Sequence, residues 1–364
     1  MRRYSAFSLA TTTFRPHTAV ASNRDGAFTT YREATRMAGF TKTDYVWMNG
    51  SLVRWADAQV NVSAHALQYG TGVFEGVLSY DTADGPAIFR LDAHLRRFFA
   101  SARFYEIEIP YTIDELTRAA VDVVRANGLE NAYLRPLAFF DSHSFAIWPK
   151  DCPVSVAIIA VPGRQYIEGG PDHGVRVTVS TVRRIDGSTL PPFVKACGHY
   201  TNSVRAAQEA IRRGYDDAIL MNTKGDVAEG SGANLFLVQN GTLVTNDVDA
   251  SIVLGITRDS VLQLARDLAI PIVIRPFSLN DLQAADELFF CGTAVEVTPI
   301  KEVDGRVVGD GTPGPVTRRI QKAFVQAVHG QSPQYRRWLT PARVVTSPSE
   351  APAQDQFAHS SELG

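Results

Sequence analysis

Cysteine and net charge are both scarce in this sequence. Three of its 364 residues are cysteines, Cys152, Cys197 and Cys291; they cannot all pair with one another, and their dispersed positions lack the spacing of a metal site. The formal net charge is -2, so no basic excess indicates binding to nucleic acid. No apolar run is long enough to span a bilayer. These absences predict a protein that binds neither metal nor membrane and resides in a reducing compartment, the cytoplasm.

The segment from Pro191 to Asn202, PPFVKACGHYTN, is the strongest candidate for chemistry. Lys195 lies there among apolar and small residues, directly before an amphipathic helix. An apolar environment lowers the pKa of a lysine amine, and the unprotonated amine is a nucleophile. A surface lysine whose stem lies along a hydrophobic rim is the alternative interpretation of this segment alone.

An acidic residue follows at the end of a predicted strand. The pattern predicts a helix over 201–213, a buried strand over 218–221 and a polar turn, after which Glu229 lies in the glycine-rich segment 227–234. Glycines there allow a ligand to approach the backbone closely. A lysine that can form a Schiff base and an acid that can pair with a pyridinium nitrogen are two requirements of a pyridoxal 5'-phosphate (PLP) site.

Two further segments offer hydrogen-bond donors to a phosphate. Residues 255–257 precede an amphipathic helix predicted over 259–268, so they would present free backbone amides and a hydroxyl at a helix N-terminus. The cluster 291–294 follows a predicted strand and contributes the hydroxyl of Thr293 together with the amides of a turn. The sequence thus supplies the third requirement of the cofactor.

Four motifs together resemble a known family. The sequence reads KACGHY at 195–200, AEGSGANLF at 228–236, LGITRD at 254–259 and CGTAVEVTP at 291–299. In this order they are similar to the signature of class IV (fold type IV) PLP-dependent aminotransferases, specifically the branched-chain amino acid aminotransferases, over roughly 44–339. The resemblance implies an α+β fold of the D-amino acid aminotransferase type, with two α+β domains and the cofactor site at their interface.

The same resemblance implies a role for each site residue. Lys195 would hold PLP and shuttle the α-proton of the substrate, Glu229 would keep the pyridine nitrogen protonated, and Tyr200 would hydrogen-bond the phenolic oxygen. The residues implied to hold the phosphate are Arg97, Ile256, Thr257 and Thr293, and the turn of Thr293 and Ala294 would offer amides to the substrate carboxylate.

The substrate side chain is expected to meet residues of the N-terminal half. Tyr69 and Phe74 lie in the segment 64–77, which glycines break too often to predict a regular helix. By resemblance they line the pocket, with Tyr69 reaching the site of the neighbouring subunit. Strand alternation puts Tyr133 and Arg135 on one face. The resemblance assigns Tyr133 to the α-carboxylate, Arg135 to the distal carboxylate of glutamate or 2-oxoglutarate, and Tyr166 to the pocket.

Composition divides the sequence into five parts. With 45% hydrophobic residues, this length allows two domains with separate cores. We expect a disordered leader over 1–43, a small α+β domain over 44–162, an interdomain loop over 163–174, a large PLP-binding domain over 175–339 and a disordered tail over 340–364. The Ser, Thr and Arg content of the leader also fits a transit peptide, or a start codon assigned ahead of Met37.

Local signals predict several elements within these domains. The small domain should contain a hairpin over 45–53, a helix over 92–105 with Asp92 as its N-cap, and a second helix over 112–127. The large domain should close with a hairpin around Asp304 and Gly305 and a last helix over 315–328.

The resemblance implies transfer of the amino group of leucine, isoleucine or valine to 2-oxoglutarate, which gives branched-chain 2-oxo acids and glutamate. It also implies a homodimer or higher homo-oligomer that acts in branched-chain amino acid biosynthesis. The sequence departs from the family at Gly163, where a tryptophan is usual, and at Leu78, His199 and Ala233. Loss of the tryptophan favours a wider range of donors.

The alternatives are a broader or aromatic-substrate transaminase of a specialised pathway, a D-amino acid or (R)-amine transaminase, an aminodeoxychorismate lyase, and a PLP carrier without turnover.

Overall fold

The first sheet contains eight strands, seven from the N-terminal half and one from near the C-terminal end. The computed structural model describes residues 41–163 and 170–343. Neighbouring strands follow the order β17-β5-β4-β6-β7-β1-β2, β3 also pairs with β6, and every pairing is antiparallel. The strands are β1 (Tyr45–Met48), β2 (Ser51–Arg54), β3 (Gly72–Phe74), β4 (Val77–Tyr80), β5 (Ala87–Phe89), β6 (Ala132–Phe140), β7 (Val154–Pro162) and β17 (Leu339–Pro341). The predicted hairpin over 45–53 is confirmed by β1 and β2.

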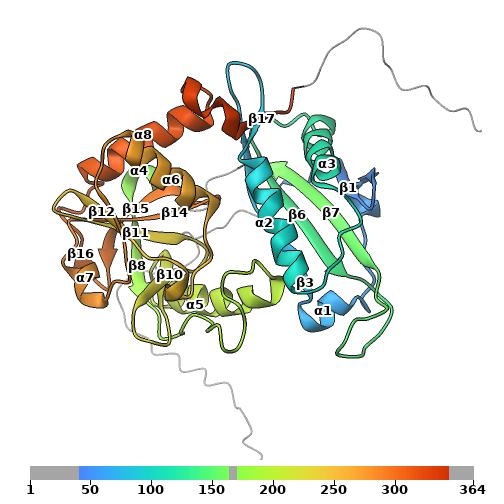
Figure 1. The fold of residues 1–364 in the computed structure, drawn as a ribbon, viewed down its shortest axis with the longest axis horizontal. Coiled ribbons are helices and arrows are strands. Elements are labelled where there is room, and N and C mark those ends of the chain that lie inside the picture. Colours follow the sequence, from blue (N-terminus) through green and yellow to red (C-terminus); the bar gives the residue numbers. More distant parts are fainter. Residues whose placement is uncertain (1–40, 164–169, 344–364) are drawn as a thin grey trace, which may run out of the picture. The chain divides into compact units, whose positions relative to one another are not determined.

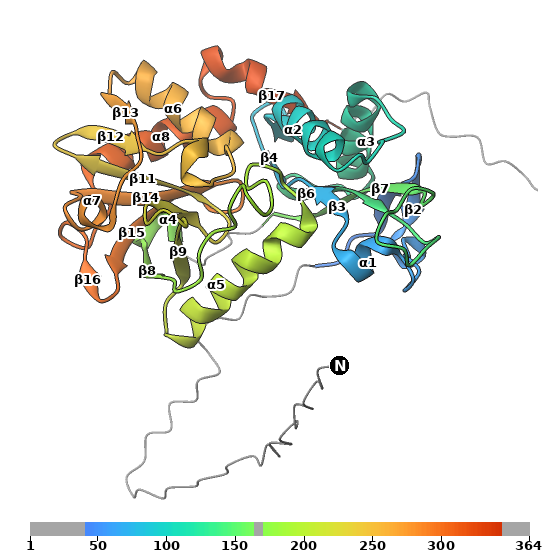
Figure 2. The same cartoon turned by 60° about the horizontal axis from the view of Figure 1, so that its bottom comes forward.

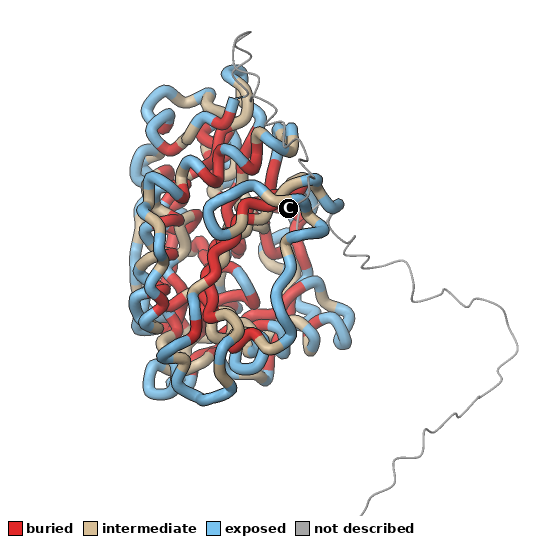
Figure 3. The backbone as a smooth tube through the Cα atoms, turned by 90° about the vertical axis from the view of Figure 1, so that its right-hand side faces the viewer, coloured by how far each residue is buried: buried red, intermediate tan, exposed pale blue. Residues whose placement is uncertain are grey.

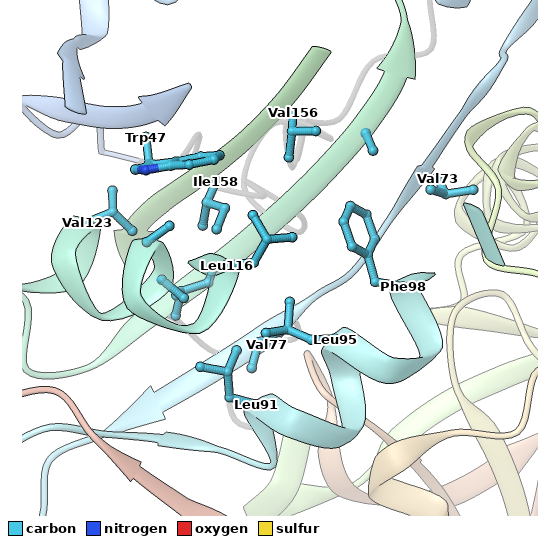
Figure 4. Close-up of a cluster of buried hydrophobic side chains, with 14 of the residues drawn as sticks. Trp47, Val73, Val77, Leu91, Leu95, Phe98, Leu116, Val123, Val156 and Ile158 are labelled. Atoms are coloured by element: carbon cyan, nitrogen blue, oxygen red, sulfur yellow. The ribbon is translucent and has the colours of Figure 1, made fainter. Parts of the chain in front are cut away.

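Two helices, α2 (Leu91–Phe104) and α3 (Ile113–Ala126), cover one face of this sheet (Figure 1). Their apolar sides and the strands form one cluster of buried side chains. Figure 4 shows Leu95 of α2 and Leu116 of α3 turned toward Ile158 of β7, and all three are fully buried. Removal of this apolar surface from water is the main force that holds the helices on the sheet.

The predicted N-cap of α2 is wrong. The helix begins at Leu91, one residue before Asp92, and the preceding residue Arg90 has a left-handed backbone with φ of 54° and makes no side-chain capping bond. The Arg90 amide donates a hydrogen bond to the carbonyl of Trp338 at 2.6 Å. A tertiary contact therefore sets this helix start, while Asp92 lies in the first turn and pairs with Arg96 at 2.9 Å.

The second predicted helix of this region begins as its sequence indicates. Thr112 accepts a hydrogen bond from the backbone of Glu115, and the Glu115 carboxylate accepts one from the backbone of Thr112. This capping box satisfies two backbone donors that the helix itself leaves free. The helix over 112–127 is confirmed within one residue at each end.

The second sheet contains nine strands and is buried on both faces. The order is β10-β9-β8-β15-β14-β11-β12-β13, with β16 paired to β15. Along β11, Phe236 belongs to the apolar cluster on one face and Leu237 to the cluster on the other. The strands are β8 (Val175–Val179), β9 (Asp217–Met221), β10 (Val227–Gly230), β11 (Asn234–Gln239), β12 (Thr242–Thr245), β13 (Ile272–Ile274), β14 (Glu287–Gly292), β15 (Glu296–Val303) and β16 (Arg306–Val307). β15 and β16 confirm the predicted closing hairpin.

The longer helices of the C-terminal half and α7 pack against the second sheet. α6 (Ile256–Asp267) and α8 (Pro315–Val328) share the cluster of one face, and α7 (Leu279–Gln283) contributes to the other. α5 (Tyr200–Arg212) lies along β9 and buries Ala206 there (Figure 2). The sequence predicted the bounds of α8 correctly, because a proline occupies its first position and apolar residues recur at helical spacing.

Two segments predicted as irregular contain short helices. The segment 64–77 holds α1 (His65–Tyr69), which ends at Gly70 in the left-handed region with φ of 70°. A Cβ atom on Gly70 would lie 2.9 Å from the Cα of Gly198, so this position requires glycine. The predicted interdomain loop holds α4 (Gly170–His173). The remaining single turns are η1 (Trp55–Asp57), η2 (Cys197–His199), η3 (Val248–Ala250) and η4 (Pro333–Trp338).

Some predictions fall outside the described residues. These are Tyr166, most of the predicted leader and most of the predicted tail. Within 41–163 and 170–343, buried residues follow the strands and the inner sides of the helices, and the turns are exposed (Figure 3). Over the same ranges no helix combines the length and apolar character needed to cross a membrane, and no His, Cys, Asp and Glu side chains gather as a metal site would need.

Candidate active site

The loop that carries Lys195 is attached to the first sheet. Ala196 forms an isolated antiparallel bridge with Val73 of β3, and the amide of Phe74 donates to the Lys195 carbonyl at 3.1 Å. From the other side, the Lys195 amide donates to the hydroxyl of Ser101 on α2 at 3.2 Å. The backbone of this lysine is therefore fixed by both β3 and α2 before the chain enters α5.

The amine of Lys195 points to an aromatic corner. Its Nζ donates a hydrogen bond to the hydroxyl of Tyr200 at 2.6 Å and lies 4.8 Å from the centre of the Phe74 ring. The two rings meet edge to face with their centres 4.7 Å apart. Phe74 is only 8% exposed, so the amine borders an apolar wall, as the sequence predicted.

Glu229 is a buried carboxylate held by three donors. Its Oε1 accepts from Nε of Arg184 at 2.8 Å, and its Oε2 accepts from the side chain of Asn234 at 3.1 Å and the amide of Val253 at 3.2 Å. Burial raises the pKa of Glu229 above its ordinary value, although Arg184, Val253 and Lys195 oppose the shift.

The N-terminus of α6 lies beside this carboxylate. Asn234, which donates to Glu229, also accepts from the amide of Gly255, the N-cap of the helix, at 3.1 Å. The next amides, of Ile256 and Thr257, open the helix and have no partner within it. Thr257 is buried at this point. These groups lie together at the start of α6, where the sequence predicts an anion site, and Asn234 links them to Glu229.

Arg97 of α2 reaches the same place from the first sheet. Its Nη1 donates to the carbonyl of Leu254 at 2.8 Å, one residue before the N-cap of α6. Its Nε and Nη2 donate to both oxygens of Glu75 at 2.6 and 2.8 Å. A guanidinium has five N–H donors. The described residues therefore engage three of the five and leave two for an anion.

Glu75 is a fully buried carboxylate that also binds His94. The Nδ1 atom of His94 lies 2.7 Å from Glu75 Oε2. Burial would raise the pKa of Glu75, but Arg97 and His94 outweigh it and hold the pKa well below its ordinary value. Burial lowers the pKa of His94 despite the carboxylate. Glu75 thus joins the Arg97 guanidinium and the His94 ring in one buried cluster.

The polar pair predicted on β6 faces Phe74. Arg135 donates to the Tyr133 hydroxyl at 2.6 Å through Nη2, and its guanidinium carbon lies 4.7 Å from the centre of the Phe74 ring. A Cβ atom on Gly76 would lie 2.4 Å from that hydroxyl, so only glycine admits Tyr133 here. The structure brings Tyr133 and Arg135 together as strand alternation predicted, and it places the ring of Phe74 beside both Arg135 and the Lys195 amine.

The structure describes three more of the predicted residues. Thr293 and Ala294 form the turn between β14 and β15 and are partly buried. Tyr69 lies on α1, is 44% exposed, and donates its hydroxyl hydrogen bond to the carbonyl of Phe145 at 2.8 Å. In the ranges that the structure describes, no hydrogen bond or ring contact joins Tyr69 to Lys195.

Sequence reasoning missed Arg184, Asn234, Glu75 and His94. The two acids and their cationic partners are far apart in sequence, so no local pattern connects them. Two signals were nevertheless present. Asn234 belongs to the motif that contains Glu229, and Glu75 stands between Phe74 and a glycine in an otherwise apolar segment. A charged residue in such a segment is usually paired when it is buried.

Comparison with known proteins agrees with this geometry. Residues 72–303 match the family model described as amino-transferase class IV. The chain belongs to the class IV aminotransferases. It is 42% identical over 302 residues to the branched-chain-amino-acid aminotransferase of Salmonella typhimurium, covering 82% of this chain and 98% of the relative.

Solved structures give the same result for the fold. The crystal structure of the Escherichia coli branched-chain amino acid aminotransferase matches with a TM-score of 0.81 and 41% identity, covering 83% of this chain and 100% of that one. The branched-chain amino acid aminotransferase from Thermobaculum terrenum in its PLP form matches with a TM-score of 0.79 and 34% identity, covering 83% and 99%. The predicted α+β class and fold type IV are confirmed. Class IV aminotransferases use PLP, and the anion site beside Glu229 and Lys195 fits that cofactor.

Proposed function

We propose that this class IV aminotransferase transfers the amino group of leucine, isoleucine and valine to 2-oxoglutarate, giving branched-chain 2-oxo acids and glutamate. The observation that carries the proposal is the ring of Phe74, which borders both the Lys195 amine at 4.8 Å and the Arg135 guanidinium at 4.7 Å. An apolar ring suits an aliphatic side chain, and a guanidinium suits a carboxylate. One pocket beside the lysine thus accepts both leucine and glutamate.

The cofactor residues follow from the donors of the site. PLP supplies the electron sink that stabilises the substrate carbanion. Lys195 would hold it through its amine. The groups that would hold its phosphate are the amides of Ile256 and Thr257, the hydroxyls of Thr257 and Thr293, and the two N–H groups of Arg97 that no described residue engages.

The side chains around Lys195 divide the proton chemistry. The Lys195 amine takes and returns the α-proton of the substrate, and the Tyr200 hydroxyl, 2.6 Å away, positions that amine. Glu229 is held by Arg184 and Asn234, and its carboxylate would keep the pyridine nitrogen of the bound cofactor protonated. The amides of the turn at Thr293 and Ala294 orient the substrate carboxylate.

Turnover by purified protein tests the proposal. Leucine with 2-oxoglutarate should give glutamate, and D-alanine should not. Lys195→Ala should lower the rate by at least about a thousandfold, because the nucleophile is lost, while the melting temperature stays near that of the parent protein. Transfer from D-alanine in place of leucine, or turnover retained by Lys195→Ala, would contradict the assignment.

The role of Arg135 can be separated from that of Lys195. Arg135→Ala should lower kcat/KM for glutamate by about a hundredfold, since a charge-assisted contact with the distal carboxylate is lost. Leucine has no such carboxylate and should be affected far less. An equal loss for both donors would show that Arg135 does not select the acid.

Gly163 bears on which amino donors the enzyme accepts. This residue directly follows β7, and its amide donates to the carbonyl of Asn131 at 2.8 Å. We propose that the missing bulk at this position widens the pocket toward larger side chains. A panel that includes phenylalanine and methionine tests it, and a strict preference for leucine, isoleucine and valine would exclude the wider range.

We also propose that the protein is a homodimer or a higher homo-oligomer. Apolar side chains are exposed on α1 and on the loop after β6: Leu67 is 64% exposed, Phe145 66%, Ile147 79% and Trp148 66%. The Tyr69 hydroxyl holds this loop to α1 through Phe145. Such a patch is typical of a subunit interface. Trp148→Glu should shift the molar mass measured by light scattering toward the monomer, and an unchanged mass would exclude this surface.

Domain division and location complete the proposal. The first sheet takes seven strands from the proposed small α+β domain over 44–162 and one, β17, from the C-terminal edge of the proposed large domain. The second sheet lies entirely within the proposed large PLP-binding domain over 175–339, and 163–174 joins the two. The cysteines Cys152, Cys197 and Cys291 are all free thiols, which suits the cytoplasm. Substrates are amino acids and 2-oxo acids. Limited proteolysis tests the division, since cleavage within 163–174 should leave two stable fragments.

A further inference from the structure

One stripe of α2 carries five polar side chains that all contact the site or its supports. Their positions, 90, 94, 97, 101 and 105, recur at the three- and four-residue spacing of a single helix face. At one end, Arg90 donates to Asp259 of α6 at 2.7 Å and Arg97 donates to the carbonyl of Leu254. At the other end, Ser101 accepts from the amide of Lys195. The helix thus spans from the anion site to the lysine.

The last contact of the stripe involves a histidine of the lysine loop. Tyr105, the C-cap residue of α2, places its hydroxyl 2.6 Å from Nε2 of His199. The Nδ1 atom of the same ring lies 3.1 Å from the carbonyl of Val194. Val194 and His199 lie on the two sides of Lys195 in sequence, and His199 directly precedes Tyr200. The ring therefore closes the loop that carries the amine and its hydroxyl partner.

The partners of the ring fix its tautomer. A carbonyl only accepts hydrogen bonds, so Nδ1 carries the proton and donates to Val194. Nε2 of the neutral ring is then an acceptor, and the Tyr105 hydroxyl is its donor. Burial lowers the pKa of His199, with Arg184 adding to the shift, which agrees with a neutral ring. His199 is 2% exposed, so no bulk water replaces the Tyr105 hydroxyl if it is removed.

We propose that Tyr105 and His199 are positioning residues that hold the lysine loop closed and keep the Lys195 amine on the Tyr200 hydroxyl. The expected effect on catalysis rests on the proposed function, whereas the coupling of the two side chains does not. Neither residue contacts the reacting atoms. They act through the Val194 carbonyl and through the backbone that joins His199 to Tyr200.

Cys197 offers a direct reporter of the loop. It lies between Lys195 and His199, is partly buried, and is a free thiol, whereas Cys152 and Cys291 are buried in the cores of the protein. Burial raises the pKa of the Cys197 thiol. Opening of the loop should therefore increase both the access and the reactivity of this thiol.

The test is a double-mutant cycle measured by thiol labelling. Tyr105→Phe removes one hydroxyl and keeps the ring. His199→Asn keeps a donor near the Nδ1 position and removes the acceptor near Nε2. Each variant should raise the rate at which a disulfide reagent labels Cys197 by about tenfold, since local opening exposes the site. The double variant should label no faster than either single variant, because both remove the same hydrogen bond.

Two controls separate positioning from loss of stability. Tyr335→Phe removes another tyrosine hydroxyl, which donates to Asp267 on α6, and should leave Cys197 labelling unchanged. Cys197→Ser measures the background from the other two thiols. His199→Gln, whose amide reaches the Nε2 position, should label more slowly than His199→Asn.

Turnover provides the second readout. Tyr105→Phe should lower kcat by about ten- to a hundredfold with little change in KM for leucine, as expected when a reacting amine is displaced by about 1 Å. Labelling at the parent rate in both single variants, or labelling effects that multiply in the double variant, would overturn the proposal. Labelling does not require transamination, so a protein that shows the coupling but no transfer from leucine would contradict the proposed function alone.

Discussion

The two ends of α2 hold the site with different chemistry. At its N-terminal end the contacts are ionic: Arg97 shares both oxygens of buried Glu75, and Arg90 pairs with Asp259. At its C-terminal end they are neutral: Ser101 accepts from the Lys195 amide, and Tyr105 donates to His199. The same helix thus supports an anion site with charges and a lysine with uncharged groups.

The difference has a simple electrostatic reason. A guanidinium attracts a phosphate, and a carboxylate bound on its other edge fixes its orientation. At the other end of α2 a hydroxyl is enough, because Ser101 has only to hold the backbone amide of Lys195 in place. The charged contacts of α2 therefore lie where the expected ligand is ionic, and the neutral contacts lie where the helix positions a loop.

The largest effect is expected from Glu75→Gln, at the ionic end. Removal of one charge from a buried pair leaves the other without compensation, so the free energy of unfolding should fall by about 4 kcal/mol. Urea titration measures it. Glu302→Gln is the matched control, because its partner Arg176 is 46% exposed and such pairs contribute less than about 1 kcal/mol. Equal losses in the two variants would show that burial does not distinguish Glu75.

A buried carboxylate without a cation provides the next comparison. Burial raises the pKa of Asp217 from 3.8 to about 6, against the hydrogen bond from Ser231. Since the folded protein holds this proton more tightly than the unfolded chain, the stability from Asp217 is present below about pH 4 and is lost as the pH rises to about 6.

Asp217→Asn should remove that dependence. The difference in unfolding free energy between the variant and the parent should change by about 3 kcal/mol in favour of the variant between pH 4 and pH 7, from a shift of about two pKa units. Urea titrations at the two pH values measure it. If the difference in unfolding free energy stays constant with pH, burial does not raise the pKa of Asp217.

Arg97→Lys tests whether the guanidinium at the ionic end of α2 binds the phosphate of PLP. The charge remains, but a lysine cannot bind Glu75 and a phosphate through separate edges. The affinity for PLP should fall by about thirtyfold, or about 2 kcal/mol. Equilibrium titration of the apoprotein measures it, and pyridoxal, which lacks the phosphate, is the control ligand. The same loss for pyridoxal would place Arg97 away from the phosphate.

Arg90→Gln should have the smallest effect. Its partner Asp259 is 62% exposed, so solvent screens the pair and the loss of stability should stay below about 1 kcal/mol. Urea titration measures this loss, and the Glu75→Gln variant titrated in parallel provides the value for comparison. A loss as large as that of Glu75→Gln would show that the ionic end of α2 acts as one network.

Sequence reasoning predicted the elements whose signals are local. The proline at the start of α8, the capping box of α3 and the Asn-Gly and Asp-Gly turns each depend on residues a few positions apart. Lys195 was found from its local sequence in the same way, and the family resemblance added Tyr200. Strand alternation also placed Tyr133 beside Arg135, which the structure confirms with a hydrogen bond at 2.6 Å.

The supports of the site depend on long-range contacts and escaped prediction. Arg184 meets Glu229 across 45 positions, and Glu75 meets Arg97 across 22. A sequence does not show which of its charges are buried together. The start of α2 at Leu91 was missed because the carbonyl of Trp338 sets it. The polar stripe of α2 was not predicted, because its partners lie far away in the sequence.

The central claim is that one lysine, Lys195, carries the cofactor at the neutral end of α2. Sodium borohydride reduction of the holoenzyme fixes a pyridoxyl group to the lysine that carries it, and peptide mass spectrometry identifies that residue. We expect one modified peptide, containing Lys195, and none from the Lys195→Ala variant. A pyridoxyl group on any other lysine of the active parent protein would contradict it.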